Sequence, residues 1–490
     1  MKKLKAAFLN PPFLKKYSRP QRSPAVTKSG TLYYPMWLSY SAALAKAQGA
    51  DIDLIDAPAD DYDLDYVINK MNRFCPDLIV MDTSTPSIHN DVRICETIKT
   101  SLPNVFILLV GTHVSALPCE SIELSEAIDA IAVGEYDLTV KDVIEALVSG
   151  SPIDNISGLC YKREGKVILT AKRALIDDLD SLPFVSPIYK EFLNTKNYFN
   201  PNALFPMVTI TTSRGCPYEC TFCVYPQTMM GHKMRLRSAD NVVEEIEYIT
   251  KNFNPLKAVF FEDDTFTVVK KRCIEISEKI LSKGINISWT ANARASLDYE
   301  TMKIMKRSGC RCLCVGFESG SQELLDNIKK SITADNMRSF MENAKRAGIL
   351  IHGCFIVGLP GETNATMTKT LELAKALNPD TVQFYPIMVY PGTEAYNWYS
   401  ERGLITTEDF SKWLTAQGLH NSVIKTQNLS SEELVKFCDY ARKSFYLRPS
   451  YLLYKLRQSF LDSHERQRNI KSAKTFIKYL MRGSDVTNRV

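Results

Sequence analysis

The sequence predicts an α/β protein: an N-terminal doubly wound, flavodoxin-like domain, a partial (β/α)6 barrel of the TIM type, and a helical C-terminal region. Two observations predict this fold. Short apolar runs alternate with segments of helical spacing in two separate series, and a proline-punctuated stretch divides the series. The 490 residues, 45% hydrophobic and 23% charged, are typical of a globular protein of several domains and exclude a disordered or fibrous chain.

The first series occupies residues 1–150 and predicts a five-stranded parallel sheet with helices between the strands. Ligands of such sheets bind beyond the carboxyl ends of the strands. The strands are expected at 6–9, 52–55, 78–81, 105–110 and 128–133. The strings expected at their carboxyl ends are Asn10-Pro11-Pro12, Thr83-Ser84-Thr85, Gly111-Thr112-His113 and Gly134-Glu135.

Residues 151–205 are interpreted as a linker that contains a hairpin, because Glu164-Gly165 separates two short apolar runs and prolines follow. Residues 206–399 hold the second series, which fits a partial barrel with its site at the strand carboxyl ends. Residues 400–490 are expected to be helical. The strands of the second series are expected at 208–212, 258–261, 288–291, 312–316, 351–357 and 381–385.

The chain has no apolar stretch of the ~20 residues that a membrane span needs, and its first residues lack the pattern of a signal peptide. We therefore expect a cytoplasmic protein. Structural disulfides are rare in that reducing compartment, so clusters among the thirteen cysteines point to metal or redox chemistry.

The strongest motif is Cys216-Pro-Tyr-Glu-Cys220-Thr-Phe-Cys223, directly after the first strand of the second series. Three thiolates in one loop can bind three irons of a cuboidal cluster and leave the fourth iron open for substrate chemistry. Zinc is the alternative. It needs a fourth ligand, and the distance to His232 fits none of the common zinc motifs.

This CxxxCxxC motif, with Phe222 before its last cysteine, resembles that of the radical S-adenosylmethionine superfamily. The resemblance implies that Cys216, Cys220 and Cys223 bind a [4Fe-4S] cluster. It further implies that the open iron chelates S-adenosylmethionine, which is cleaved reductively to a 5′-deoxyadenosyl radical. The resemblance also implies that Phe222 takes part in cofactor binding.

By the same resemblance, side chains at the ends of the later strands bind S-adenosylmethionine. Carboxylates suit its ammonium and ribose hydroxyls, and an arginine suits its carboxylate. Each residue has a structural alternative: a solvated acidic turn, an internal ion pair, or a helix cap at Thr363. The expected residues are Glu262, Asp263, Asp264, Asn292, Arg294, Glu318, Ser319 and Gly358.

Four further cysteines lie on or beside the fourth and fifth strands of this series: Cys310, Cys312, Cys314 and Cys354. Cysteine is often buried as a small apolar residue, so core packing is the favoured interpretation. A second metal site and hydrogen-atom donation to a product radical are the alternatives.

A doubly wound domain ahead of such a barrel resembles the cobalamin-binding class of this superfamily. The DxHxxG motif that supplies histidine to cobalt elsewhere is absent, because Gly111 stands where His113 would require Asp. We therefore expect cobalt without a protein imidazole. A domain that has lost its ligand is the alternative. The residues expected to contact cobalamin are Asn10, Thr83, Ser84, Gly111, Thr112, His113, Gly134 and Glu135.

Within that class, strings such as Leu32-Tyr-Tyr-Pro-Met-Trp-Leu38 and Phe445-Tyr-Leu-Arg-Pro449 resemble the hopanoid-biosynthesis proteins that act on polyol side chains. The resemblance implies hydrogen abstraction from an sp3 carbon, then formation or rearrangement of a carbon–carbon bond, with flavodoxin or ferredoxin as electron donor. Methylation of another natural product is the alternative. A non-catalytic cobalamin carrier is the alternative of another class, and methylthio transfer to transfer RNA is more distant.

The last fifty residues contain 12 Lys or Arg and 3 Asp or Glu, although the whole chain has a net charge of only +5. Leucines and tyrosines alternate with these cations over 446–460, a pattern that suits an anionic membrane surface. A helix packed on the barrel is the alternative. No nucleic-acid-binding module accompanies the basic stretch, so nucleic acid is not expected as a partner.

Overall fold

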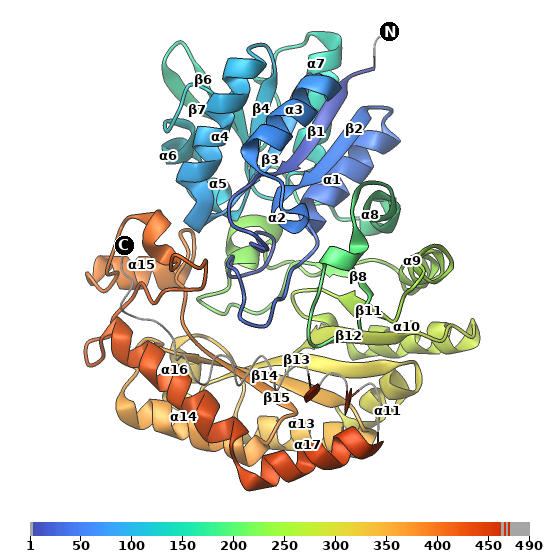
Figure 1. Ribbon diagram of the computed structural model, residues 1–490, viewed down its shortest axis with the longest axis vertical. Coiled ribbons are helices and arrows are strands. Elements are labelled where there is room, and N and C mark those ends of the chain that lie inside the picture. Colours follow the sequence, from blue (N-terminus) through green and yellow to red (C-terminus); the bar gives the residue numbers. More distant parts are fainter. Residues whose placement is uncertain (1–2, 462–464, 467–468, 471–490) are drawn as a thin grey trace.

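The computed structural model describes residues 3–461, 465–466 and 469–470, which form two α/β units with one above the other in Figure 1. The first unit is a seven-stranded sheet in the order β2-β1-β3-β4-β5-β6-β7, with β2 to β5 parallel. Its strands are β1 Lys5–Asn10, β2 Asp51–Asp56, β3 Leu78–Thr83, β4 Phe106–Gly111, β5 Ala130–Ala132, β6 Leu159–Arg163 and β7 Lys166–Leu169.

Helices cover both faces of this sheet, and two separate apolar cores lie on its two sides. The doubly wound fold predicted from the alternating pattern is therefore confirmed. The helices are α1 Met36–Ala47, α2 Ala57–Asp60, α3 Leu64–Phe74, α4 Ile88–Ser101, α5 Thr112–Ala116, α6 Pro118–Ile122 and α7 Asp137–Ser149.

The predicted hairpin exists as β6 and β7, but it is part of the first sheet and not of a free linker. Its strand β6 pairs antiparallel with β5, Ala130 facing Tyr161. A two-stranded hairpin is marginally stable alone, so pairing with an edge strand stabilises it. The true connection between the units starts after β7 and contains the helix α8 Ser186–Phe192.

The second unit is a six-stranded parallel sheet in the order β15-β14-β13-β12-β11-β8, curved as an open barrel. The predicted partial barrel is confirmed, with edges at β8 and β15. Its strands are β8 Met207–Ile210, β11 Ala258–Phe261, β12 Ser288–Ala293, β13 Cys310–Glu318, β14 Leu350–Val357 and β15 Thr381–Pro386, and a small ribbon pairs β9 Ser213–Arg214 with β10 Arg235–Leu236.

Helices on the outer side of this sheet connect successive strands, as right-handed β-α-β crossovers require. Several begin at a side-chain cap, such as Ser238 for α9 and Thr333 for α13. These connecting helices are α9 Ala239–Asn252, α10 Lys270–Ser282, α11 Tyr299–Arg307, α12 Gln322–Asn327, α13 Ala334–Ala347 and α14 Asn364–Leu377. A further helix, α15 Glu394–Glu401, follows the last strand.

The C-terminal region is helical only in part. After α15 the chain runs without long helices to Ser430, and a short turn at Phe410–Trp413 reaches back to the first unit, where Phe410 lies against His113. The helices α16 Ser431–Tyr446 and α17 Pro449–Leu461 follow, separated before Pro449 as expected. The basic residues after 470 lie outside the described residues. Within the described residues no helix is long and apolar enough to cross a membrane.

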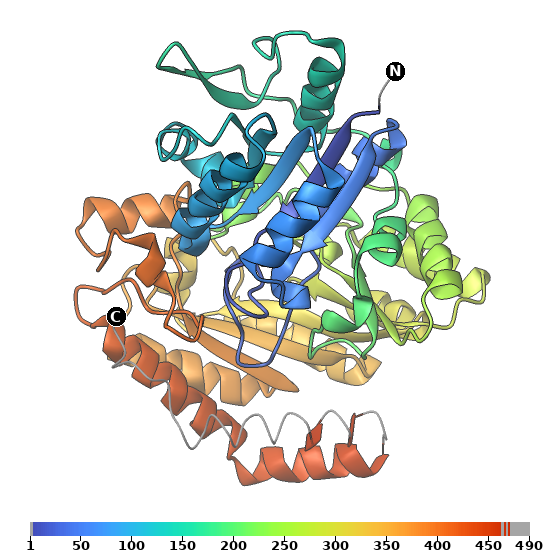
Figure 2. The same cartoon turned by 45° about the horizontal axis from the view of Figure 1, so that its top comes forward.

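Residues 11–35, here called the strap, leave β1 and cross the space between the two units (Figure 1, and from above in Figure 2). Leu32 and Phe199 exchange backbone hydrogen bonds at the far end of the strap. Val26 N donates to the carbonyl of Gly418 at 2.8 Å, so the C-terminal region also holds it. The strap therefore closes over the carboxyl ends of the barrel strands.

Candidate active site

The three motif cysteines lie in the loop that follows β8 and β9. Gly215 enters this loop with φ of +80°, and a Cβ there would lie 2.3 Å from the carbonyl oxygen of Lys233. Glycine is therefore required where the chain turns toward Cys216. Cys216 and Cys220 are buried and Cys223 is half-buried, so the loop presents its sulfurs to the interior.

The surroundings of these thiols suit iron–sulfur chemistry. Burial raises the pKa of Cys216 and of Cys223, and Arg22 opposes the rise at Cys223. Thiols in such a site lose their protons when a metal binds them. A cuboidal cluster takes each of the three thiolates on a separate iron, whereas a zinc ion would need a fourth ligand at the same point.

The predicted carboxylates follow β11 and meet a cation from the first unit. Arg22 of the strap places Nη1 at 2.5 Å from Glu262 Oε1 and Nη2 at 3.1 Å from Asp264 Oδ1. Burial raises the pKa of both carboxyl groups, and Arg22 opposes that rise. The second oxygen of Glu262, Oε2, is buried and accepts no hydrogen bond of ordinary geometry from the described residues, although the Asn292 amide lies near enough to oppose the rise in the pKa of this carboxyl group.

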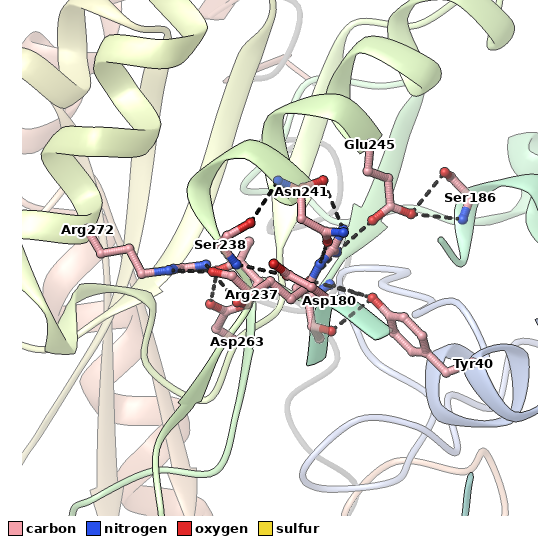
Figure 3. Close-up of polar contacts among 11 residues, drawn as sticks. Tyr40, Asp180, Ser186, Arg237, Ser238, Asn241, Glu245, Asp263 and Arg272 are labelled. Carbon is pink, nitrogen blue, oxygen red and sulfur yellow. Dashed lines mark hydrogen bonds and ion pairs between the residues drawn. The ribbon is translucent and has the colours of Figure 1, made fainter. Parts of the chain in front are cut away.

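Asp263 points the other way. Its carboxylate accepts hydrogen bonds from the Thr212 backbone at 2.6 Å and from the Ser213 hydroxyl at 2.8 Å. Arg272 Nη1 donates to Thr212 Oγ1 at 3.0 Å, and Figure 3 shows Arg272 and Asp263 meeting at this point. Asn292 Nδ2 donates to the Asp263 backbone oxygen. This geometry favours a positioning role for Asp263, which fixes the end of β8 before the cysteines, over the direct cofactor contact predicted from sequence.

Figure 3 also shows how α9 is tied to this point. Arg237 Nη1 donates to the carbonyl of Thr211 at 2.8 Å and to Glu245 Oε2 at 2.6 Å, and Glu245 Oε1 accepts from Ser186. Arg237 and Glu245 are both buried. The end of β8 is thus held from two helices, which gives the cysteine loop a rigid base.

Two further predicted residues place unpartnered polar atoms near the cysteines. Arg294 Nη1 lies 3.9 Å from Cys220 Sγ while its Nη2 has no partner among the described residues. Glu318 Oε1 accepts from Lys330 Nζ at 2.7 Å while Oε2 has none. Glu318 also has φ of +64°, a strained value for a residue with a Cβ, as often found where function fixes a side chain.

These buried unpartnered atoms are the test of whether the residues fit S-adenosylmethionine. A buried polar atom without a partner costs about 1 to 3 kcal/mol, so three of them around one end of the barrel indicate a polar ligand. Glu262 offers an acceptor for an ammonium, Arg294 a donor for a carboxylate, and Glu318 an acceptor for hydroxyls. The residues fit the cofactor.

The other three predicted residues lie near the same end of the barrel. Ser319 is buried, and its hydroxyl is within 3.2 Å of Thr370 Oγ1. Gly358 ends β14 with φ of +81° and donates its N–H to Glu362. Phe222 is half-buried against the main core. Ser319 and Gly358 make internal contacts here, so their part in cofactor binding stays a prediction.

The extra cysteines are divided between the two faces of the barrel sheet, because Cys310 belongs to the main core under the helices and Cys314 to a separate small core. Cys310 and Cys312 are buried, and Cys314 packs against a small core that contains Ala258 and Phe260, as the packing interpretation expects. Cys314 and Cys354 are only half-buried. Tyr33 of the strap faces the same region: burial raises its pKa, and Glu262 adds to the rise.

At the carboxyl edge of the first sheet, three of the predicted cobalamin residues are hydrogen-bonded to neighbouring residues of the same unit. Asn10 Nδ2 donates to Asp56 at 2.7 Å, Thr83 Oγ1 donates to the carbonyl of Val110 at 2.7 Å, and Ser84 Oγ lies 2.8 Å from Tyr17 OH. These contacts favour positioning roles for the three side chains.

The next four predicted residues lie in the loops that follow β4 and β5. Gly111 has φ of +117°, and a Cβ would meet the Thr83 carbonyl at 2.5 Å. Thr112 begins α5 and is half-buried. His113 is buried between Thr85 and Phe410, and burial lowers its pKa to about 3. Gly134 donates its N–H to Ser115.

Glu135 contacts the second unit. Its oxygens accept from Arg214 at 2.8 Å and from Arg235 at 2.6 Å, and Arg214 also pairs with Asp137 at 2.6 Å. All four side chains are buried, and Arg214 lies over the ring of Tyr40. This network, here called the interface clamp, favours a role for Glu135 in joining the units over the direct cobalamin contact predicted from sequence.

An unpartnered polar atom also marks the edge of the first sheet. Tyr136 OH is buried without a partner among the described residues, whereas the Trp37 indole is directed at Tyr225, where its hydrogen bond opposes the rise in the pKa of that hydroxyl. Burial raises the pKa of Tyr136, and Asp82 adds to the rise, so this hydroxyl stays protonated and can donate. A corrin presents many amide groups, and Tyr136 fits it as a donor.

Several residues of this region were missed from sequence: Arg22, Tyr33, Lys330 and the partners of Glu135. Arg22 and Tyr33 stand in a loop with no periodic pattern, so nothing local indicates that they enter the barrel. Arg214 gave the clearest signal, because it lies two residues before Cys216. Charge partners that are far apart in sequence are not visible without the fold.

Comparison with known proteins agrees with this geometry. The family model "Radical SAM superfamily" matches residues 210–374, and "B12 binding domain" matches residues 22–144. The chain is 33% identical over 425 residues to the uncharacterized methyltransferase PH0819 of Pyrococcus horikoshii, covering 86% of this chain and 90% of that protein. The chain therefore belongs to the cobalamin-binding class of the radical S-adenosylmethionine superfamily. It is an enzyme of that class, with a [4Fe-4S] cluster, S-adenosylmethionine and cobalamin as its cofactors.

Solved structures show the same fold. The methyltransferase TsrM from Kitasatospora setae, with cobalamin and a [4Fe-4S] cluster bound, has a TM-score of 0.72 at 15% identity, covering 97% of this chain and 99% of that chain. The radical enzyme OxsB, with aqua-cobalamin and S-adenosylmethionine bound, has a TM-score of 0.70 at 16% identity, covering 99% of this chain and 73% of that chain.

The predicted kinship with hopanoid-biosynthesis proteins is supported only distantly. The hopanoid C-3 methylase of Methylococcus capsulatus is 23% identical over 381 residues, covering 77% of this chain and 70% of that protein. This identity is well below that of PH0819. These identities establish the cobalamin-binding radical S-adenosylmethionine family, but they do not assign the chain to the hopanoid-biosynthesis proteins within it.

Proposed function

We propose that this chain is a cobalamin-dependent radical S-adenosylmethionine methyltransferase that acts on an sp3 carbon of a small molecule. The structural observation that carries the proposal is the set of buried unpartnered atoms of Glu262, Arg294 and Glu318 beside the cysteine loop. Methyl transfer is favoured over carbon–carbon rearrangement because the 33% identical relative is named a methyltransferase.

Different residues of the chain are proposed to bind the cluster and the separate parts of S-adenosylmethionine. Cys216, Cys220 and Cys223 hold the cluster, Glu262 and Arg294 hold the two ends of the amino acid part of S-adenosylmethionine, and Glu318 holds its ribose. When bound, the cluster supplies one electron for cleavage of S-adenosylmethionine, and the corrinoid accepts and donates a methyl group. The strap and the turn at Phe410–Trp413 cover the region between the units and keep water out.

The products test this proposal. Anaerobically reconstituted protein with cobalamin, reductant, S-adenosylmethionine and an extract of small molecules should form S-adenosylhomocysteine together with 5′-deoxyadenosine. When the S-adenosylmethionine carries a deuterated methyl group, that group should appear in one compound of the extract. Formation of 5′-deoxyadenosine alone would support the rearrangement alternative, and formation of neither would contradict the proposal.

The hopanoid polyol side chain remains our proposal for the substrate, with less support than methyl transfer itself. Comparison of lipids from a deletion strain and its parent tests it, since loss of a methylated or extended hopanoid is expected. Flavodoxin or ferredoxin is proposed as the electron donor, and contact of the C-terminal region with a membrane surface would bring a lipid substrate within reach.

A further inference from the structure

The strap places the guanidinium of Arg22 between two carboxylates that follow β11. The side chain of Arg22 is 30% exposed, whereas those of Glu262 and Asp264 are 4% and 6% exposed. Arg22 Nη2 also donates to the backbone oxygen of Asp263 at 3.1 Å. Arg22 belongs to the first unit in sequence and to the second unit in its contacts.

Neighbouring residues fix the strap at this point. Ser23 Oγ lies 3.0 Å from Tyr390 OH and 2.8 Å from His420 Nε2, and both partners are far along the chain. On the other side, the hydroxyl of Tyr225 donates to the carbonyl of Pro20, and the Arg22 guanidinium lies 5.6 Å from the centre of the Tyr225 ring. The position of Arg22 is therefore set by packing on both sides.

The charges of Glu262, Asp264 and Arg22 indicate which chemical group these side chains would bind. With both carboxyl groups ionised, Glu262, Asp264 and Arg22 together carry one net negative charge, and among the described residues Glu262 Oε2 has no hydrogen-bond partner of ordinary geometry. A single cation that donates hydrogen bonds would satisfy both the charge and the free oxygen, and an ammonium is such a group. Without Arg22, the two carboxylates would repel each other and lose their common orientation.

We propose that Arg22 is a positioning residue for S-adenosylmethionine: it holds Glu262 and Asp264 so that Glu262 receives the ammonium of the cofactor. The strap of the cobalamin-binding unit thereby contributes to cofactor affinity in the barrel. The inference rests on the assignment of S-adenosylmethionine to this end of the barrel and is independent of whether the reaction is methyl transfer.

The test is equilibrium binding of S-adenosylmethionine to anaerobic, cluster-loaded full-length protein, without reductant, so that no turnover occurs. Arg22→Ala should raise the dissociation constant about tenfold or more, as loss of a buried charge partner predicts. Arg22→Lys should restore much of the affinity. Lys15→Ala, in the exposed part of the strap, is the matched control and should leave the dissociation constant unchanged.

Glu262→Gln separates this role from general loosening. If Arg22 acts through Glu262, Arg22→Ala should cost much less affinity in the Glu262→Gln background than in the wild type. Iron content shows whether each variant keeps its cluster. Should Arg22→Ala lose the cluster, Tyr390→Phe takes its place: it removes only the hydrogen bond to Ser23 and should weaken binding by a smaller factor.

Unchanged or tighter binding in Arg22→Ala would overturn the inference, as would equal losses in Arg22→Ala and Arg22→Lys, and tighter binding would identify Arg22 as a competitor of the ammonium. If Tyr390→Phe is the variant measured, unchanged binding would overturn the inference too. Failure of the wild-type protein to bind S-adenosylmethionine would overturn the inference together with the proposed function. Normal wild-type binding with an unaffected Arg22→Ala would overturn the role of Arg22 alone.

Discussion

The thirteen cysteines of this chain differ sharply in their surroundings. Cys95 and Cys438 are buried in apolar cores, where a thiol acts as a small hydrophobic residue. Cys216, Cys220 and Cys223 instead lie in one loop beside Arg22, Arg294 and Asp264. Position, more than residue type, therefore separates proposed iron ligands from core residues.

Cys220→Ala is expected to abolish both cluster assembly and cleavage of S-adenosylmethionine, because two thiolates cannot retain the cuboidal cluster. Cobalt content should stay near the wild-type value, since the corrinoid is proposed to bind the other unit. Iron and cobalt analysis and assay of 5′-deoxyadenosine measure these outcomes. Cys438→Ala, a buried cysteine of α16, is the control and should cleave normally. Cleavage retained by Cys220→Ala would refute the ligand assignment.

Glu362 provides a prediction about pH. Its side chain is buried in the turn after β14, where it accepts from Gly358 N, and burial raises its pKa from 4.5 to about 7. Between these two values the folded protein keeps a proton that the unfolded chain has released. The free energy of unfolding should therefore fall as pH rises through this window, by at most about 1.4 kcal/mol per pH unit.

Glu362→Gln keeps the shape of the side chain and removes its titration, so its unfolding free energy should depend less on pH between about 4.5 and 7. Above pH 7 it should exceed that of the wild type by up to about 3 kcal/mol. Denaturant unfolding at several pH values measures both effects. Glu342→Gln, on the exposed side of α13, is the control. Equal slopes for wild type and Glu362→Gln would contradict the prediction.

At the scale of elements, the strands and most helices of both units were predictable because each carries its own periodic pattern. The strand Ala258–Phe261 was predicted to the residue. The strap and residues 402–430 were not, because irregular segments have no period and their places depend on distant partners such as Gly418 for Val26. The same limit explains why the cysteine motif was found from sequence and Arg22 was not.

The helix α17 is an element whose outward face is apolar. Among the described residues, nine of the sixteen exposed large hydrophobic side chains lie at or after Tyr440. Leu452, Leu453, Leu456 and Phe460 share one face of α17, while Tyr451 is buried against the barrel. Arg457 is exposed beside them, and the chain beyond residue 470 is basic in sequence.

We expect this face to bind anionic vesicles. The full-length protein should sediment with vesicles of phosphatidylcholine and phosphatidylglycerol, less at high salt, and not with phosphatidylcholine alone. Leu456→Ser with Phe460→Ser should lower binding about tenfold or more, since each side chain contributes roughly 1.5 to 3 kcal/mol when buried. Val148→Ser with Leu169→Ser, exposed apolar residues of the first unit, is the matched control. Failure of the wild-type protein to sediment would refute membrane contact.

At the scale of the whole molecule, the two units are joined by polar contacts as well as by one continuous apolar core. The core that contains Phe8 of β1 also contains Val208 of β8 and Val259 of β11. The interface clamp of Glu135, Asp137, Arg214 and Arg235 lies beside it and leads directly into Gly215 and Cys216. The same buried charges therefore orient the first unit and anchor the start of the cysteine loop.

Glu135→Gln tests how far the molecule depends on this clamp. Removing one carboxylate leaves Arg235 without its acidic partner and Arg214 with Asp137 alone, and breaking a buried ion pair costs about 3 to 5 kcal/mol. We expect the free energy of unfolding to fall by about that amount and iron to be lost faster, because the clamp holds the residue before Gly215. Glu191→Gln removes the exposed pair between Lys46 of α1 and Glu191 of α8 and should change stability by less than about 1 kcal/mol. Equal, small effects of the two substitutions in denaturant unfolding would show that the apolar core alone joins the units.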